Sequence, residues 1–272
     1  MSLDVGTRKA PRAALAAFVV LIFAYLLLPT FFVVPMSFSN QPYLSFPPPG
    51  WSLRWYEAMW NNSDWTRATL SSVLVGIPTA ILSVVLGTLA ALATLRGGLR
   101  WAATASALII APMMLPHIIL AIGLYPLLLK LGLLRSYVGV VIGHTVIAMP
   151  LVFITVSAAL RNYPEQLELA AMTCGADRWR TFRHVTLPMI RVGMFSGAIL
   201  AFASSFDELM LSLFLTGSTT RTLPRLIWEQ LNFYLTPAIA AVATLLLAFS
   251  LVMLAIVAVL GRDSQRPGVA RA

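Results

Sequence analysis

The chain alternates between long runs of apolar residues and short polar stretches that carry most of its charge. Six apolar runs can be marked, at 13–36, 68–95, 102–129, 137–160, 190–215 and 237–261. A helix needs roughly 20 apolar residues to cross about 30 Å of hydrocarbon, and each run is long enough for one crossing. The pattern predicts an all-α integral membrane protein with about six transmembrane helices.

Composition supports this class and excludes a soluble one. Of the 272 residues, 59% are hydrophobic and 11% are charged, whereas soluble domains carry about 25% charged residues. The six runs leave little chain for a soluble domain. We therefore expect one membrane domain over 13–262, preceded by a short segment, 1–12, and followed by a short tail, 263–272.

The distribution of positive charge predicts an orientation. A net charge of +9 would suggest nucleic acid as the partner of a soluble protein, but here the basic residues lie between the apolar runs. With the N-terminus in the cytoplasm, 13 of the 19 lysines and arginines fall inside and 6 fall outside. Cytoplasmic loops are enriched in these residues. We therefore expect both termini in the cytoplasm, and the lipid bilayer, not nucleic acid, as the partner.

The first apolar run follows Arg8, Lys9 and Arg12, as the core of a signal peptide would. It stays uncharged from 13 to 53, which is longer than the core of a cleaved signal, and no small-residue cleavage pattern follows. We expect a retained first helix. Cys174 is the only cysteine, so an internal disulfide is excluded, and we interpret it as a reduced, structural thiol.

Residues 37–66 form the longest segment expected outside the membrane. Pro47–Pro49 exclude one continuous helix here. Two interpretations remain, a helix lying on the outer leaflet, which we favour, and a contact surface for an extracellular partner. Both rest on aromatic residues of the kind enriched at membrane–water interfaces. These are Trp51, Trp55, Tyr56, Trp60 and Trp65.

Small residues and prolines predict how the spans pack. Glycines four residues apart allow helix backbones to approach closely in lipid, and such pairs occur at Gly139/Gly143 and at Gly193/Gly197. Prolines inside spans predict kinks. Neighbouring helices must then satisfy the carbonyl groups that each kink frees. The prolines are Pro78, Pro112 and Pro116.

The loop at 161–188, between the fourth and fifth runs, has the pattern of two short amphipathic helices. Pro164 suits a first helical turn, Gly175 supplies the left-handed residue that ends many helices, and Asp177 can begin the second helix. The apolar side of this second helix carries Trp179, Phe182 and Val185. Such a loop either packs under its own bundle or fills a groove on another protein, and the pattern alone does not choose.

The spacing of this loop resembles the "EAA" loop of ABC-importer permeases. Ala170-Ala171 is followed by three residues, then Gly175, nine residues and Val185-Thr186-Leu187-Pro188. In that family the loop contains the coupling helix, which sits in a cleft of the cytoplasmic ATPase. The resemblance implies a set of coupling residues, namely Glu168, Leu169, Ala170, Ala171, Gly175, Ala176, Trp179, Leu187 and Pro188.

One departure from the family pattern concerns a carboxylate. The family usually has a glutamate directly before the two alanines, and Leu169 stands there in this chain. Glu168 is adjacent, but neighbouring positions on a helix point about 100° apart. Glu168 therefore cannot present the same contact without a rotation of the helix, and the role of this carboxylate stays open.

The resemblance extends over most of the chain. WSLRWYEAM (51–59), APMMLPHIILAIG (111–123), GHTVIAMPLV (143–152) and SFDELMLSLFLTGSTTRTLP (205–224) are similar to the importer permeases for spermidine and putrescine. The resemblance implies a type I importer (MetI-like) permease fold in a bacterial inner membrane. It also implies a homologous second permease, two copies of an ATPase that holds ATP and Mg²⁺, a periplasmic substrate-binding protein, and no cofactor in this chain.

Asp207 and Glu208 interrupt the fifth run, about 25 Å from Arg191 at ~1.5 Å per residue. A carboxylate at mid-membrane costs about 2.5–3.5 kcal/mol and so needs compensation. Ser204, Glu208 and Ser212 are spaced four residues apart, which predicts a polar stripe on one helical face.

Two hypotheses account for the two acidic residues. In the first, they attract an organic polycation into the translocation path, because opposite charge acts strongly in a low-dielectric cleft. In the second, they are structural and pair with Arg221, with Arg225 or with the partner permease.

His117 and His144 also lie inside spans. No carboxylate or thiol stands at metal-ligand spacing to either, so we expect hydrogen-bonded interior residues and no metal. His184 is a weaker candidate for contact with the ATPase.

The sequence contains no P-loop, no Gly-x-Ser-x-Gly and no His-Glu-x-x-His motif. We therefore expect a transport subunit that is not itself an enzyme. A secondary transporter, which needs paired interrupted spans, and an ion channel are the alternatives from other classes. Opines, phosphonates and amino-acid derivatives are the alternative cargoes.

Overall fold

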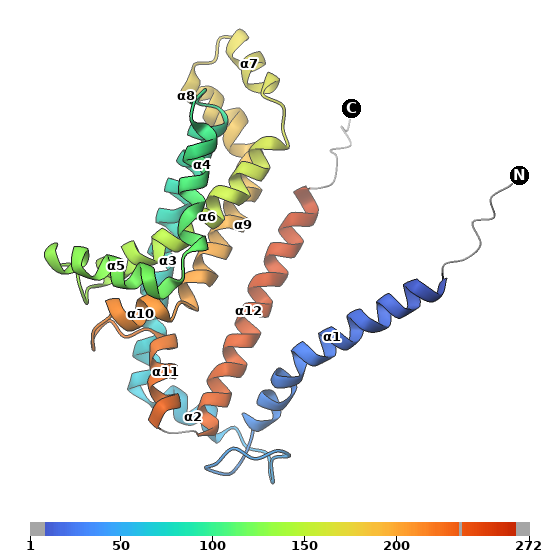
Figure 1. Ribbon diagram of the computed structural model, residues 1–272, viewed down its shortest axis with the longest axis vertical. Coiled ribbons are helices and arrows are strands. Elements are labelled where there is room, and N and C mark those ends of the chain that lie inside the picture. The colour runs from blue at the N-terminus through green and yellow to red at the C-terminus, as the bar shows by residue number, and fades with distance from the viewer. Residues whose placement is uncertain (1–8, 234–235, 265–272) are drawn as a thin grey trace, which may run out of the picture. The chain divides into compact units, whose positions relative to one another are not determined.

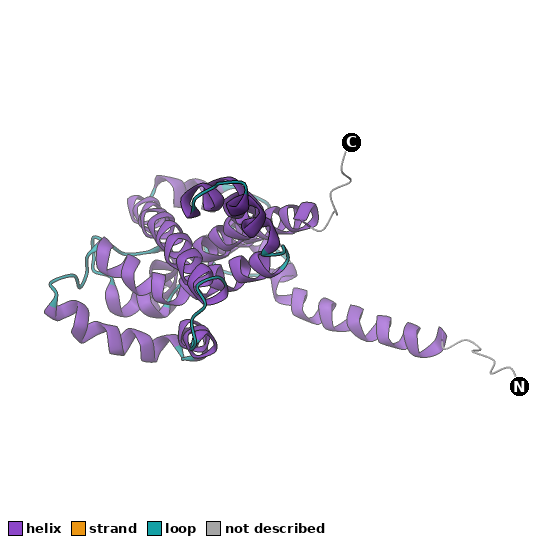
Figure 2. Ribbon diagram, turned by 90° about the horizontal axis from the view of Figure 1, so that it is seen from above, coloured by secondary structure: helices purple, strands orange, loops and turns teal. Residues whose placement is uncertain are grey.

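The computed structural model describes residues 9–233 and 236–264, whose regular elements are all helices (Figures 1 and 2). Residues 1–8 of the predicted N-terminal segment and 265–272 of the predicted tail lie outside the described residues. The chain divides into two compact units, Met1–Asn61 with Leu231–Leu247, and Asn62–Gln230 with Ala248–Ala272.

The first unit contains α1 (Lys9–Met36), α2 (Arg54–Asn61) and the start of α12 (Pro237–Ser264). The segment between α1 and α2 folds back on itself through an isolated antiparallel bridge between the backbones of Ser39 and Trp51. The predicted group of interfacial aromatics is only partly present here. Trp51 and Trp60 are 70% and 75% exposed, whereas Trp65 is buried in the second unit.

The second unit holds the remaining helices. They are α3 (Ser63–Leu95), α4 (Ala102–Ile110), the 3-10 turn η1 (Ala111–Met114), α5 (His117–Lys130), α6 (Tyr137–Arg161), α7 (Gln166–Thr173), α8 (Arg178–Thr181), the π-helical turn η2 (Phe182–Thr186), α9 (Leu187–Phe206), α10 (Met210–Leu215) and most of α11 (Leu223–Phe233).

The core of this unit is made where α3, α6 and α9 pack side by side (Figure 1). Glycines bring the three backbones together around Val152 of α6. A Cβ atom at Gly87 of α3 would lie 2.9 Å from Val152 Cβ, and one at Gly193 of α9 would lie 2.8 Å from Thr155 O. A Cβ atom at Gly197 would lie 2.5 Å from Thr155 Oγ1. The predicted close packing through Gly193 and Gly197 is therefore confirmed.

Among the described residues, five helices are long and apolar enough to cross a membrane, or six if the bent pair formed by Ala102–Met114 and His117–Lys130 is one span. The two halves of this pair meet at 102°, so α5 is turned across the axis of α4 (Figure 1). Pro116 caps α5 and lacks an N–H to continue the helix. The predicted kink is present, but it is a sharp turn that the predicted span over 102–129 did not anticipate.

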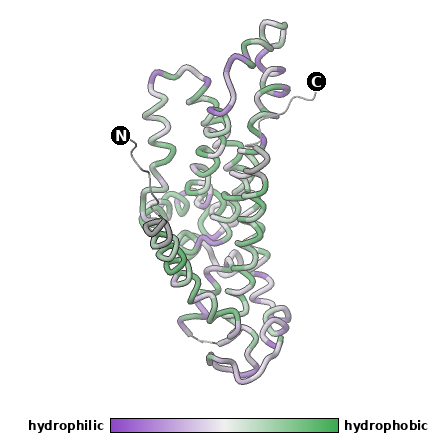
Figure 3. Tube along the Cα trace, turned by 90° about the vertical axis from the view of Figure 1, so that its right-hand side faces the viewer, coloured by the Kyte–Doolittle hydropathy of each residue, from purple (hydrophilic) through white to green (hydrophobic). Residues whose placement is uncertain are grey.

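The fifth predicted span also differs from its prediction of 190–215. Its helix runs without a break from Arg178 to Phe206, because η2 joins α8 to α9. The helix then ends at Asp207, and α10 begins at Met210. Hydrophobic residues follow the long helices and polar ones gather where helices end (Figure 3).

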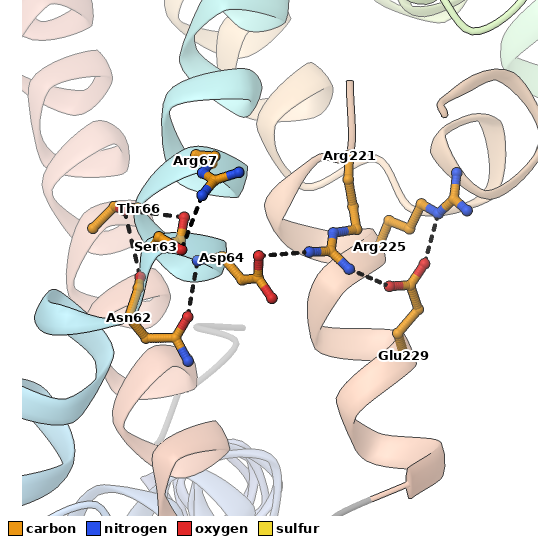
Figure 4. Close-up of polar contacts among 8 residues, drawn as sticks. All are labelled: Asn62, Ser63, Asp64, Thr66, Arg67, Arg221, Arg225 and Glu229. Carbon is orange, nitrogen blue, oxygen red and sulfur yellow. Dashed lines mark hydrogen bonds and ion pairs between the residues drawn. The ribbon is translucent and has the colours of Figure 1, made fainter. Parts of the chain in front are cut away.

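An ion-pair network joins the start of α3 to α11 (Figure 4). Asn62 caps α3 by accepting from the Asp64 N–H at 2.8 Å. Asp64 pairs with Arg221 at 3.2 Å, and Glu229 pairs with both Arg221, at 3.1 Å, and Arg225, at 2.8 Å. Arg221 and Arg225 are thus paired with Asp64 and Glu229, and not with Asp207 or Glu208 as the structural hypothesis supposed.

Candidate functional site

The loop between α6 and α9 has the two-helix form that its sequence predicts. α7 ends in a Schellman motif, in which the Gly175 N–H donates to Met172 O at 3.0 Å and the Ala176 N–H to Ala171 O at 3.1 Å. Gly175 has φ +90°, and a Cβ atom there would meet nothing within 4 Å. The requirement for glycine therefore comes from the backbone conformation alone.

The second half of the loop starts at Asp177, whose side chain accepts from the Arg180 N–H at 2.7 Å. This is the N-cap that the sequence predicts. The fifth run is predicted to begin at residue 190, but its helix begins earlier, because the π-helical turn η2 carries the helix from α8 through Leu187 and Pro188 into α9. A π turn within an α-helix leaves an extra residue in the turn and so shifts the faces of the two halves.

Glu168 is the residue that ties the loop to the rest of its unit. Its side chain is 15% exposed and its Oε1 lies 3.4 Å from Arg96 Nε at the end of α3. The Tyr163 hydroxyl and the Thr186 hydroxyl, the latter at 3.1 Å, donate to the same oxygen. Burial, and then the hydrogen bond to Glu168, raise the pKa of Tyr163, so its hydroxyl stays a donor.

Arg96 makes further contacts that fix this cluster. Its Nη2 donates to Leu160 O at 3.0 Å and to Tyr163 O at 3.3 Å, and its guanidinium lies 5.1 Å from the Tyr163 ring centroid. Leu160 O is one of the carbonyl oxygens left free at the end of α6, where a cation is favourable, and Tyr163 O follows two residues after that helix. The end of α6, the end of α3 and the loop are therefore held as one piece.

Leu169 points away from this cluster and is 52% exposed. The other exposed apolar residues of the loop include Leu167 at 44%, Met172 at 38% and Trp179 at 67%. Ala170 is exposed and Ala171 half-buried. The role of the Glu168 carboxylate, which the sequence left open, follows from these positions. Glu168 faces the bundle, and Leu169 faces outward with the small and apolar surface of α7.

The two acidic residues after α9 both lie in the break between α9 and α10, but their surroundings differ. Glu208 is buried, at 6% exposed, whereas Asp207 is exposed. Glu208 Oε2 lies 2.8 Å from His117 Nδ1 at the start of α5, and Glu208 Oε1 accepts from the Leu211 N–H at 3.0 Å. Asp207 makes no side-chain hydrogen bond or ion pair within the described part of the chain.

A second histidine continues the network. The Ser212 hydroxyl donates to Glu208 O at 2.7 Å and lies 3.3 Å from His144 Nε2, while His144 Nδ1 lies 2.8 Å from Ser205 Oγ. The network is complete when the His144 proton is on Nε2, because Ser212 then accepts it and Ser205 donates to Nδ1. Every polar group of the fully buried His144 thus has a partner.

The predicted polar stripe of Ser204, Glu208 and Ser212 is wrong as a helical face, because α9 ends between the first two. Glu208 and Ser212 do come together, and Ser205 takes the place expected of Ser204. His117 lies 91 residues from Glu208 in sequence, so no local spacing could reveal the pair.

Comparison with protein families decides the class of the chain. The family of binding-protein-dependent transport system inner membrane components matches residues 83–266. The chain belongs to this family. It is therefore a membrane-spanning permease subunit of a binding-protein-dependent importer in the inner membrane.

Individual relatives agree with the family. The permease is 29% identical over 238 residues to the spermidine/putrescine transport system permease protein PotC of Haemophilus influenzae, covering 87% of this chain and 92% of the relative. It is 30% identical over 232 residues to the putrescine transport system permease protein PotI of Escherichia coli, covering 83% and 82%.

A solved structure shows the same fold. A chain of a bacterial ABC transporter that imports the acidic polysaccharide alginate aligns with a TM-score of 0.72 at 13% identity, covering 94% of the permease and 98% of that chain. At this identity the likeness concerns the fold alone. It confirms the predicted type I importer (MetI-like) permease fold.

Proposed function

We propose that this permease forms one half of the path through which an ATP-driven importer carries a small organic cation of the polyamine type. The main support for this proposal is the pair of acidic residues at the break between α9 and α10. Glu208 is buried there, and Asp207 is exposed without a partner in the described part of the chain. The names of the relatives PotC and PotI point to the same class of cargo.

The partner of Glu208 suits a path for amines. His117 is 40% exposed through its side chain, while the Glu208 side chain is 6% exposed. An approaching ammonium group can donate to Glu208 Oε2 in place of the imidazole. Because the carboxylate lies in a low-dielectric setting, its attraction for a cation is screened much less than it would be in water. Asp207 would meet the cargo first and Glu208 would receive it.

A pocket of about 780 Å³ is lined mostly by apolar side chains, mainly of α3 and α9, and includes neither Asp207 nor Glu208. The acidic residues would therefore face a channel that a homologous second permease completes. A periplasmic substrate-binding protein would deliver the cargo from outside.

Energy would enter through the loop at 161–188. We assign the outward apolar surface of α7, with Leu169, Ala170 and Met172, as the surface that fits a cleft of a cytoplasmic ATPase. Two ATPase copies would bind ATP and Mg²⁺, and this chain would couple without catalysing. Both chain termini would then lie in the cytoplasm, in agreement with the excess of basic residues on that side.

The test is uptake of labelled putrescine and spermidine by the complete importer in proteoliposomes. The variants are Glu208→Gln and Asp207→Asn, and Glu57→Gln, an exposed carboxylate on α2, is the control. We expect Glu208→Gln to lower uptake at least about tenfold, equivalent to about 1.4 kcal/mol, and Asp207→Asn to lower it less. The amount of bound ATPase and basal ATP hydrolysis should not change.

Loss of the assembled complex in Glu208→Gln would instead favour the structural hypothesis. Normal uptake by both variants would remove the acidic residues from the path. Uptake of an opine, a phosphonate or an amino-acid derivative, without uptake of polyamines, would show that the cargo class is wrong while leaving the importer assignment intact. The cleanest readout of cargo is the ligand that raises the melting temperature of the cognate binding protein.

A further inference from the structure

A polar pocket of about 550 Å³ lies between the α5–α6 loop and the α10–α11 loop. Its size is in the range of small-ligand sites. No acidic side chain of the described residues lines it. The polar groups that line it are two arginines and four hydroxyl-bearing residues, namely Tyr125, Arg135, Thr216, Ser218, Thr219 and Arg225.

Arg135 is presented to this pocket by an unusual backbone. Its φ is +62°, a left-handed conformation that residues other than glycine rarely adopt. The backbone is held on both sides, because its N–H donates to Leu215 O at 3.0 Å and its carbonyl accepts from Thr220 Oγ1 at 3.3 Å. A Cβ atom at Gly217 would lie 3.0 Å from Arg135 Cβ, so glycine lets the arginine lie against the facing loop. Strained residues of this kind cluster at ligand sites.

In the described residues, no carboxylate neutralises the positive charge of the Arg135 guanidinium. Arg225 already donates to Thr216 O at 2.6 Å and pairs with Glu229 at 2.8 Å. Glu229 is shared with Arg221, at 3.1 Å. Within the described residues, the Arg135 side chain has neither an ion pair nor a hydrogen bond. The pocket therefore keeps a positive potential that attracts anions.

The hydroxyl groups that line the pocket indicate which kind of anion it can bind. The side chains of Tyr125, Ser218 and Thr219 make no hydrogen bond within the part of the chain that is described, so each can donate to a ligand. A guanidinium with its planar fork of N–H groups and several hydroxyls match the many acceptor oxygens of a phosphate group. A cationic cargo would be repelled here, so the pocket is separate from the path through Glu208.

We propose that this pocket binds a phosphate group, supplied either by free phosphate or by the headgroup of a phospholipid. Both sources present the same oxygens to Arg135, Ser218 and Thr219. The proposal does not depend on the identity of the imported cargo. It concerns a pocket on the opposite side of the bundle from the ATPase-facing loop by the predicted topology.

The test uses the complete importer, purified in maltoside detergent with its nucleotide sites filled by Mg·ADP. One arm titrates inorganic phosphate by calorimetry. The other measures phosphatidylglycerol retained by the complex, using native mass spectrometry. The variant is Arg135→Gln, and the matched control is Lys130→Gln, which removes the same charge from an exposed residue at the end of α5 that does not line the pocket.

We expect Arg135→Gln to weaken phosphate binding at least about tenfold, or to abolish phosphatidylglycerol retention, while Lys130→Gln changes neither. Phosphate binding would identify a free ion as the ligand, and retention of lipid alone would identify a headgroup. Equal loss in both variants, or no dependence on Arg135 in either arm, would overturn the proposal. Arg135→Gly should also lose binding without a lower melting temperature, because glycine relieves the left-handed backbone. Binding that persists in Arg135→Gly would overturn the proposal as well.

Discussion

Glu168 in α7 and Glu208 in the break between α9 and α10 both accept several hydrogen bonds, but the basic side chains that pair with them differ. Glu168 is paired with Arg96, which is always charged, and with two hydroxyls. Glu208 is paired with the imidazole of His117 and with a backbone N–H. The guanidinium of Arg96 always carries a charge, which suits a contact that must hold the loop in place. The imidazole of His117 makes a weaker pair, which suits a carboxylate that exchanges its partner for cargo under the proposed function.

The largest expected effect comes from giving Glu208 a permanent partner. His117→Arg places a guanidinium beside the carboxylate that we propose receives the cargo, so polyamine uptake should fall at least about tenfold. The melting temperature should stay equal or rise, because the new pair is stronger. Proteoliposome uptake and thermal unfolding measure the two quantities.

His117→Gln is the control for this change, since it keeps a hydrogen-bond donor but no charge. Its uptake should stay nearer to that of the wild type. If His117→Arg transports normally, the exchange of partners at Glu208 plays no part in transport, and the contrast with Glu168 loses its functional meaning.

An intermediate effect is expected from removing the permanent partner of Glu168. Arg96→Gln leaves a largely buried carboxylate with hydroxyl donors only, and frees the carbonyls of Leu160 and Tyr163. Losing charge-assisted hydrogen bonds of this kind costs about 1.5–3 kcal/mol. Limited proteolysis should cut the loop at 161–188 faster, and less ATPase should copurify. Arg100→Gln, an exposed arginine of the neighbouring loop, should show neither change, and equal behaviour of the two variants would contradict the joint.

The smallest effect is expected at Leu169, which is exposed on α7 and which we assign to the proposed ATPase-facing surface. Leu169→Ser removes exposed apolar area, so the permease should unfold at the same temperature while its affinity for the ATPase falls a few-fold, about 1 kcal/mol. Cys174→Ser, exposed in the same loop, serves as the control. An unchanged ATPase affinity would show that α7 docks through another face, and a lowered melting temperature would show that Leu169 packs within the permease.

The parts of the fold that sequence could predict are those set by local chemistry. The turn at Gly175 and the cap at Asp177 depend on residues within about five positions, and both were found where the pattern places them. The close packing at Gly193 and Gly197 in α9 could also be predicted, because small residues four positions apart in a membrane helix usually allow another helix backbone to approach closely. The long apolar runs likewise predict spans directly from length.

The features that sequence could not predict depend on contacts between distant segments. The pairing of Glu208 with His117 spans 91 residues, and that of Arg96 with Glu168 spans 72. The break after Phe206 removes a helical face that the spacing of Ser204 and Ser212 suggested. An apolar run shows that a segment suits the membrane, but it does not show where tertiary contacts stop the helix inside the run.

The π-helical turn η2 has a mechanical consequence. Because it joins α8 to α9 without a break, the 29 residues from Arg178 to Phe206 form one rod of roughly 43 Å at ~1.5 Å per residue. Trp179 stands at one end and Asp207 follows the other. A tilt of about 5° with the centre of rotation at one end moves the opposite tip by roughly 4 Å, which exceeds the 2.8 Å between Glu208 and His117. A small tilt of this rod would therefore be enough to separate these two side chains, with no relay of side-chain movements between its ends.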